Sequence, residues 1–270
     1  MINILQTEFF RLKKSALFWS LFGVCAVLPL MSALLNLISF TLLDALESTG
    51  MEYDVWELIK SSNVTGMALS EVPGLSDHSI FALICTSIFL CKEFSGGTFR
   101  NMLLANRSRR ELYLSYILTA VVIASTYLGV SFVSILICNG AIFGFGTMTA
   151  AQAIAACVIA LAMGLIFAIF LQSMMCMFMF GTRKLSVALA CPLVISIVAP
   201  SLLYSFIEVF AQFGVITRVD MSWIPLYNIN LLDLTQIDGA LIGKILLYII
   251  PLTFLFGLCG WITFKKADLK

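Results

Sequence analysis

Residues 112–182 read LYLSYILTAVVIASTYLGVSFVSILICNGAIFGFGTMTAAQAIAACVIALAMGLIFAIFLQSMMCMFMFGT, a run without any Asp, Glu, Lys, Arg or His. A helix rises 1.5 Å per residue, so about 20 apolar residues cross the roughly 30 Å hydrocarbon core of a bilayer. At about 70 residues, the run is too long for one span. Its most polar and glycine-rich part, 139–149, provides a turn. We therefore expect a hairpin of two transmembrane helices, at 112–138 and 150–180.

The whole chain has the composition of a membrane protein. Of its 270 residues, 61% are hydrophobic and only 11% are charged. A water-soluble domain carries about 25% charged residues, and a disordered chain is poor in apolar residues, so both classes are excluded. The formal net charge of +1 provides no basic field for phosphates, so nucleic acid is not expected as a partner.

Four further apolar runs complete the expected fold. The run 16–43 is uncharged and longer than the apolar core of a signal peptide, so we expect a retained span. The run 78–92 is short, and the runs 185–207 and 241–264 contain prolines, which membrane helices tolerate. The sequence predicts an all-α polytopic membrane protein, a single domain over 1–270 with six transmembrane helices. Their expected positions are about 16–43, 78–92, 112–138, 150–180, 185–207 and 241–264.

The charged segments orient these helices. Lys and Arg cluster at 11–14, 92–110, 183–184 and 265–270, and these segments fall on one side of a six-span chain. Because cationic loops remain cytoplasmic, we expect both termini in the cytoplasm. The outer loops, 44–77 and 208–240, are acidic. Residues 1–15 are expected to form an amphipathic interfacial helix on the inner leaflet.

The sequence contains few residues that could support catalysis. A single histidine, His78, excludes an H-E-x-x-H zinc site, and no G-x-S-x-G motif is present. The stretch 239–245, GALIGKI, lacks both the spacing and the hydroxyl residue of a phosphate loop. The eight cysteines lie in apolar runs without a C-x-x-C pair, so we expect buried thiols. We predict no catalytic residue, no metal site and no cofactor in this chain.

The expected spans are almost empty of ionisable side chains. Carriers driven by protons or sodium ions usually keep such groups near the middle of the membrane, where a charge is costly. An ion-coupled carrier is therefore disfavoured, and the energy for any transport would come from a partner protein.

The longest cytoplasmic loop, 92–111, has a distinctive pattern. The glycines at 96–97 interrupt the helix that leaves the membrane, and Thr98 can cap a new helix. That helix would have an apolar side formed by Phe99, Met102 and Leu103. Ser108, with Glu111 three residues later, is typical of a capping box at the start of the third span. We expect a short amphipathic helix that can lie in a groove of a soluble subunit.

The order of residues through this loop resembles a known family. Glutamate at the end of the second span is followed by Gly-Thr, a basic residue, a Leu-Leu pair and Ser-Arg. The positions are Glu93, Gly97, Thr98, Arg100, Leu103, Leu104, Ser108 and Arg109. Together with the six-span plan, they resemble the permease subunits of ABC type-2 exporters. The chain start, with Glu8, Arg11 and Lys13, is similar to the family's connecting helix. Tyr116 stands where the family commonly has a lysine, so that lysine's role is not carried over.

The resemblance implies that the loop 92–111 is a coupling interface for a separate ATPase. Its expected residues are Glu93, Gly97, Thr98, Phe99, Arg100, Leu103, Arg107 and Arg109. The arginines alone would also suit any cytoplasmic loop, by the positive-inside rule. A salt bridge between Glu93 and Arg100 requires that the glycines between them do not turn the chain.

The implied function is that of a transmembrane permease subunit of an ATP-driven ABC exporter in the bacterial cell membrane. The expected partners are an ABC ATPase subunit, which binds the ATP and magnesium, and a second, identical or paralogous permease subunit. The acidic outer loops favour an amphipathic or hydrophobic substrate such as an antimicrobial peptide. The alternative is a non-transporting immunity or sensor protein that sequesters a ligand at its acidic outer loops.

Overall fold

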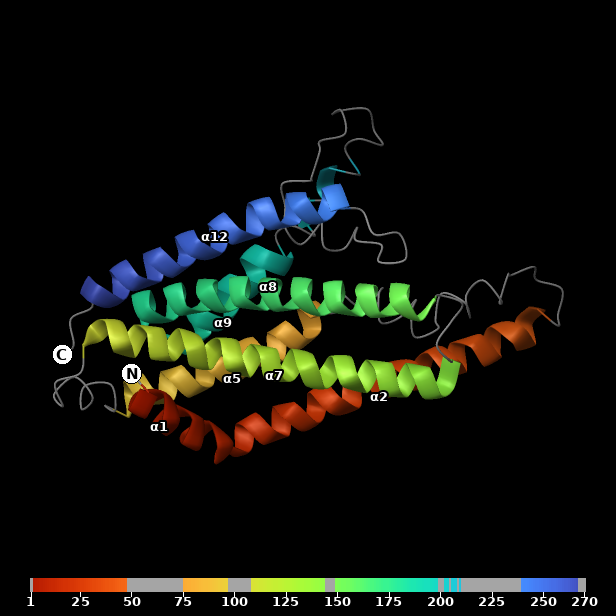
Figure 1. The fold of residues 1–270 in the computed structure, drawn as a ribbon, viewed down its shortest axis with the longest axis horizontal. Helices are drawn as coiled ribbons and strands as arrows, with labels where there is room; N and C mark the ends of the chain where they lie inside the picture. Colours follow the sequence, from red (N-terminus) through yellow and green to blue (C-terminus); the bar gives the residue numbers. More distant parts are fainter. Residues whose placement is uncertain are drawn as a thin grey trace.

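Two long antiparallel helices, α7 (Arg109–Phe143) and α8 (Ala150–Thr182), form the centre of a helical bundle (Figure 1). Helix α2 (Ala16–Glu47) packs against α7, and α12 (Gly239–Lys266) packs against α8. Helix α5 (Leu75–Ser95) contacts both central helices. The computed structural model describes residues 2–47, 75–96, 108–143, 149–198 and 239–266, with a few positions between 202 and 209. The expected outer loops and most of the coupling loop lie outside these ranges.

The hairpin predicted from residues 112–182 is confirmed. Helix α7 ends at Phe143 and α8 begins at Ala150, within the segment expected to turn. Capping interactions define both starts. The Ser108 hydroxyl accepts the Glu111 backbone N–H at 3.3 Å, as the capping pattern predicts. At the start of α8, the Gln152 side-chain carbonyl accepts the Thr149 backbone N–H and hydroxyl, at 3.3 and 2.8 Å.

Four of the six expected spans are confirmed as helices long and apolar enough to cross a membrane: α2, α7, α8 and α12. The other two runs are helical but do not reach that standard in the described residues. Helix α5 has polar residues at both ends. Helix α9 (Leu185–Leu193) is only nine residues long and is followed by a π-helical segment, η1 (Val194–Val198). The π turn follows Pro192, which cannot donate a backbone hydrogen bond within the helix.

A proline in α2 explains how that helix is joined to α7. Pro29 has no N–H, so the carbonyl of Cys25, four residues earlier, lacks its usual helical donor. The hydroxyl of Ser131 on α7 donates to this carbonyl at 3.1 Å, and that of Ser134 donates to the Ala26 carbonyl at 2.5 Å. A polar side chain from a neighbouring helix thus satisfies the group that proline frees, as membrane interiors require.

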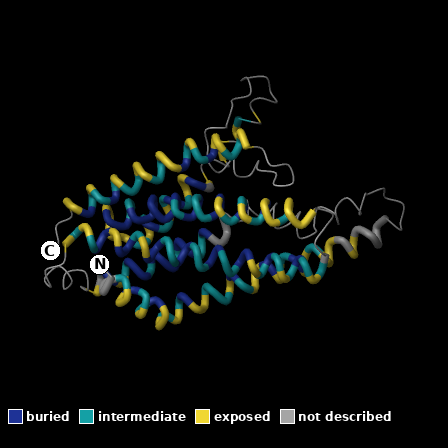
Figure 2. Tube along the Cα trace, in the orientation of Figure 1, coloured by how far each residue is buried: buried dark blue, intermediate teal, exposed yellow. Residues whose placement is uncertain are grey.

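Buried residues concentrate toward the end of the bundle that holds both chain termini (Figure 2). There, rings from four helices pack together, and the closest pair is Phe180 with Phe264, at 4.7 Å between centroids. The others are Phe94, Tyr113 and Trp261. Three methionines of α8 are part of the buried core: Met174, Met175 and Met179. The outer sides of α2 and α12 expose large apolar residues, as helices facing lipid do. All eight cysteines are free thiols.

Candidate functional site

The charged helix ends gather at one end of the bundle. Helix α1 (Ile2–Lys13), the last turn of α5, the first turn of α7 and the last turn of α12 all lie there (Figure 1). These are the helix ends that the charge pattern predicts to face the cytoplasm. The expected loop 92–111 connects α5 to α7 at this same end. The candidate coupling site therefore consists of helices that the structure describes and of a loop that lies mostly outside the described residues.

Helix α1 is separate from α2 and is fixed to it by a turn. The Ser15 hydroxyl accepts the Phe18 backbone N–H at 3.5 Å, which caps α2. The Trp19 indole donates to the Lys13 carbonyl at the end of α1 at 2.8 Å. Leu12 is buried in a core shared with α2, α5 and α7. The helix expected over 1–15 is therefore present, with one face packed and the side chains of Lys13 and Lys14 exposed.

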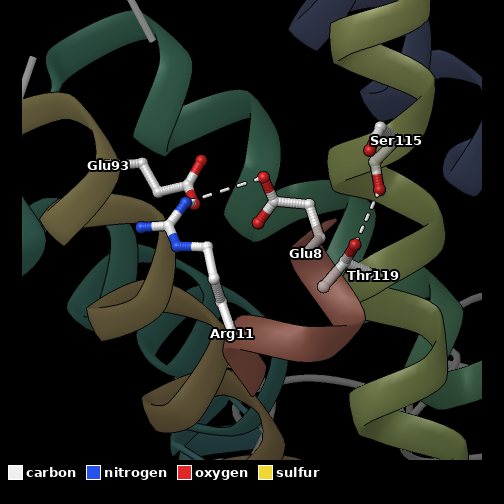
Figure 3. Close-up of polar contacts among 5 residues, drawn as sticks. All are labelled: Glu8, Arg11, Glu93, Ser115 and Thr119. Carbon is white, nitrogen blue, oxygen red and sulfur yellow. Dashed lines mark hydrogen bonds and ion pairs between the residues drawn. The ribbon is translucent and has the colours of Figure 1, made fainter. Parts of the chain in front are cut away.

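Three charged side chains join α1 to the end of α5 (Figure 3). The guanidinium of Arg11 donates to the Glu93 carboxylate, and it lies 3.7 Å from the Glu8 carboxylate on its own helix. The two carboxylates are almost fully buried, at 0% and 1% exposed, whereas the arginine is 34% exposed. The guanidinium also lies 5.7 Å from the centre of the Phe89 ring. We call Glu8, Arg11 and Glu93 the carboxylate–arginine cluster.

The cluster holds two acids and one permanent cation. Burial and, to a smaller extent, the neighbouring Glu93 carboxylate together outweigh the opposite effect of Arg11 and raise the pKa of Glu8 to about 8. At neutral pH Glu8 is therefore mostly protonated and carries no charge. The positive charge of the guanidinium then offsets the one remaining carboxylate. The cluster is neutral in this state, which is the state that its burial favours.

Polar residues of α7 lie beside the cluster (Figure 3). Thr119 donates to the Ser115 carbonyl at 2.9 Å, and both side chains are buried. The hydroxyl of Tyr116, also buried, interacts with the Glu93 carboxylate. Tyr116 is the position where the resembling family commonly has a lysine. The structure thus places this departure from the family pattern directly at the cluster.

The structure locates five of the eleven predicted site residues. Glu93, Glu8 and Arg11 come together, while Lys13 is exposed at the end of α1. Arg109 donates to the Lys265 carbonyl, so it links α7 to α12 rather than α1 to α5. The remaining predictions lie outside the described residues: Gly97, Thr98, Phe99, Arg100, Leu103 and Arg107. The salt bridge considered between Glu93 and Arg100 therefore also lies outside the described residues. Within them, Glu93 forms an ion pair with Arg11.

Sequence reasoning placed Glu8 and Arg11 in one helix and Glu93 in another, but did not connect them. Arg11 and Glu93 are 82 positions apart, and no short-range pattern pairs them. Polar residues at positions 115 and 119, one helical turn apart in an apolar span, were a usable signal for a polar site on α7. In the described residues no group of three His, Cys, Asp or Glu side chains could hold a metal ion.

Residues 4–200 match the profile of a family described as ABC-2 family transporter protein. The match begins in α1, includes α2, α5, α7, α8 and α9, and ends just beyond η1. It therefore contains the carboxylate–arginine cluster and the whole loop 92–111. No curated protein matches the sequence.

Proposed function

Because the chain belongs to the ABC-2 family of transporter membrane proteins, we propose that it couples a partner ATPase to export through the loop 92–111 and the carboxylate–arginine cluster. Members of this family are multi-pass membrane permeases, normally without catalysis of their own, that work with an ATPase. The proposal concerns how this chain receives the ATPase's movement and what it exports.

One observation carries the coupling proposal. Arg11 binds Glu93, which lies three residues before the last described position of the segment that enters the loop. A displacement of the loop would therefore pull on α1 through a partly buried ion pair, and on α7 directly. Tyr116 on α7 contacts the same carboxylate. The loop, α1 and α7 would thus move together instead of bending independently.

The energetics of the pair suit such a role. In a fully buried ion pair, removal of one partner costs about 3–5 kcal/mol, because a buried charge is left uncompensated. Arg11 is 34% exposed, so the cost for this pair is smaller. The pair therefore resists separation under load. A contact that only oriented the helix in the membrane would not need burial of both carboxylates.

For the substrate, we propose an amphipathic or hydrophobic compound, with a cationic peptide favoured. Between Leu112 and Thr182 the sequence contains no Asp, Glu, Lys, Arg or His, so the described central helices α7 and α8 offer no buried charge for a small ion. The acidic outer segments of the sequence favour a cationic compound on the outside. The direction of transport, outward, rests on the family resemblance.

The coupling proposal is tested in a complex of this chain with a candidate partner ATPase. Loop variants Phe99→Ala and Arg100→Ala should lose the ATPase on co-purification. Cluster variants Arg11→Gln and Glu93→Gln should retain it, but hydrolysis should no longer respond to the transported compound. Lys13→Gln, exposed on the same helix as Arg11, is the matched control and should behave as wild type.

Two outcomes contradict the proposal. If Arg11→Gln and Glu93→Gln keep full substrate-stimulated hydrolysis, the cluster does not transmit movement. If no ATPase associates with the wild-type chain, the loop is not a docking site. The alternative of a ligand-sequestering immunity or sensor protein then accounts better for the acidic outer segments.

A further inference from the structure

A groove opens between α7, α8 and α12 near the basic end of the bundle. Its volume is about 540 Å³, and its walls are mainly apolar. Ile117 comes from α7, Ile169 from α8, and Phe254 and Leu258 from α12. Both α12 residues are exposed, at 68% and 45%, so the groove opens sideways rather than closing into a cavity. In a membrane, this opening faces lipid or another helix.

The groove has a basic mouth. Arg110, in the first turn of α7, lines it and is exposed. Among the residues that the structure describes, Arg110 takes part in no ion pair. The neighbouring Arg109 donates to the Lys265 carbonyl, which brings the basic last turn of α12 to the same place. Trp261 also lines the groove, and tryptophan favours the depth of lipid headgroups.

The length of the groove suits one leaflet. On α12 it extends from Thr253 to Trp261, which is about 12 Å at 1.5 Å per residue. One leaflet contributes about 15 Å, half of the roughly 30 Å hydrocarbon core. An acyl chain that enters beside Arg110 would therefore run along most of its length within the groove.

We propose that this groove binds an anionic phospholipid of the inner leaflet, with its phosphate on Arg110 and an acyl chain along Phe254 and Leu258. Basic pockets between helices on the cytoplasmic side recognise such headgroups. A second copy of this chain suits the groove less well, because α12 carries no acidic residue and the acids of α2, Asp44 and Glu47, lie in its last turn, at the end of the bundle opposite the basic one.

The bound lipid would join two helices that the protein already holds together. The Tyr113 hydroxyl donates to the Gly257 carbonyl at 2.5 Å in the wall of the groove. Helix α7 begins at Arg109, within the last residues of the loop 92–111. An anionic lipid at Arg110 would therefore stabilise the position of α7 relative to α12 close to the coupling loop.

Gly257 provides a precise way to fill the groove. A Cβ at this position meets no atom within 4 Å, and Gly257 lines the groove, so the side chain of Gly257→Leu would start in open space there. Gly243, on the same helix but outside the groove, also has open space around its Cβ, and Gly243→Leu is the matched control. For the headgroup, Arg110→Ala is matched by Lys184→Ala, another exposed cation, at the start of α9.

The experiment places the purified chain in nanodiscs of phosphatidylcholine with phosphatidylglycerol and counts the lipids retained in native mass spectrometry. Wild type, Gly243→Leu and Lys184→Ala should retain phosphatidylglycerol in preference to phosphatidylcholine. Arg110→Ala should lower that preference about tenfold or more, as loss of a charge-assisted contact does. Gly257→Leu should abolish retention, and added inorganic phosphate should not compete.

Three results would overturn the proposal. The first is an equal retention of both lipids by wild type, which indicates only annular contact. The second is an unchanged preference in Arg110→Ala, whose exposed position makes it the decisive variant if Gly257→Leu does not fold. The third is loss of permease dimers in Gly257→Leu with unchanged lipid retention, which would make the groove a subunit interface.

Discussion

Replacement of Glu8 by Gln should remove most of the pH dependence of this protein's stability. The Glu8 side chain is fully buried, and its pKa is raised from an ordinary 4.5 to about 8. Glutamine has nearly the same shape and cannot ionise. Its side-chain N–H can also replace the O–H of the protonated carboxyl as the donor to the neighbouring carboxylate, so the packing of α1 should be retained.

The size of the effect follows from proton linkage. Below pH 4.5 the carboxyl is protonated in the folded and the unfolded chain, so its full stabilising contribution is present. Between 4.5 and 8 only the folded chain keeps the proton, and the free energy of unfolding falls by about 1.4 kcal/mol per pH unit. From pH 5 to 7 the loss is about 3 kcal/mol. Above pH 8 the group is ionised in both states and no further loss occurs.

The assay is unfolding of the purified chain in detergent, followed by tryptophan fluorescence between pH 5 and 9. The wild type should lose stability steadily up to about pH 8, and Glu8→Gln should lose much less. Glu111→Gln, at the capped start of α7, is the control and should keep the wild-type slope. A flat wild-type profile, or an unchanged slope in Glu8→Gln, would refute the assignment of the bound proton to Glu8.

Three further substitutions test the packing around the same helices. Tyr116→Lys would place a second cation at the cluster, so the pH-dependent loss of stability should shrink as in Glu8→Gln; an unchanged profile would contradict the described geometry. Ser131→Ala leaves a proline-freed carbonyl of α2 without its donor and should cost about 0.5–2 kcal/mol in chemical unfolding, whereas Ser39→Ala, on an exposed surface, should cost little. Gly260→Ala would place a Cβ 2.8 Å from a tyrosine hydroxyl and should cost about 1–3 kcal/mol, whereas Gly243→Ala has open space; equal stability of these two variants would refute the close approach of α12.

The sequence predicts the long helices well, because the hydrocarbon core imposes a length and an absence of charge that can be read directly. The hairpin of α7 and α8 turns within the expected residues. The shorter elements are harder to predict. In the fifth run, Pro192 is followed by a π-helical segment, and an apolar run alone contains no signal for that change.

The candidate site also has a part that the sequence predicts and a part that it does not. Local signals identified the amphipathic start of the chain, the capping Ser108 and the glutamate at the end of the second run. The pairing of Arg11 with Glu93 depends on how α1 packs against α5 and α7, and it joins residues 82 positions apart. The sequence marked Tyr116 only as a departure from a family pattern, and the structure gives that departure a physical context beside Glu93.

The central claim, that the carboxylate–arginine cluster transmits the ATPase's movement, is tested most directly by charge exchange in the reconstituted complex. Arg11→Glu alone gives the cluster three carboxyl groups, and Glu93→Arg alone gives it two cations. The double variant restores the original balance with the partners reversed. We expect each single variant to lose substrate-stimulated ATP hydrolysis while retaining the ATPase, and the double variant to recover most of it. Full stimulation in both single variants, or no recovery in a folded double variant, would contradict the account.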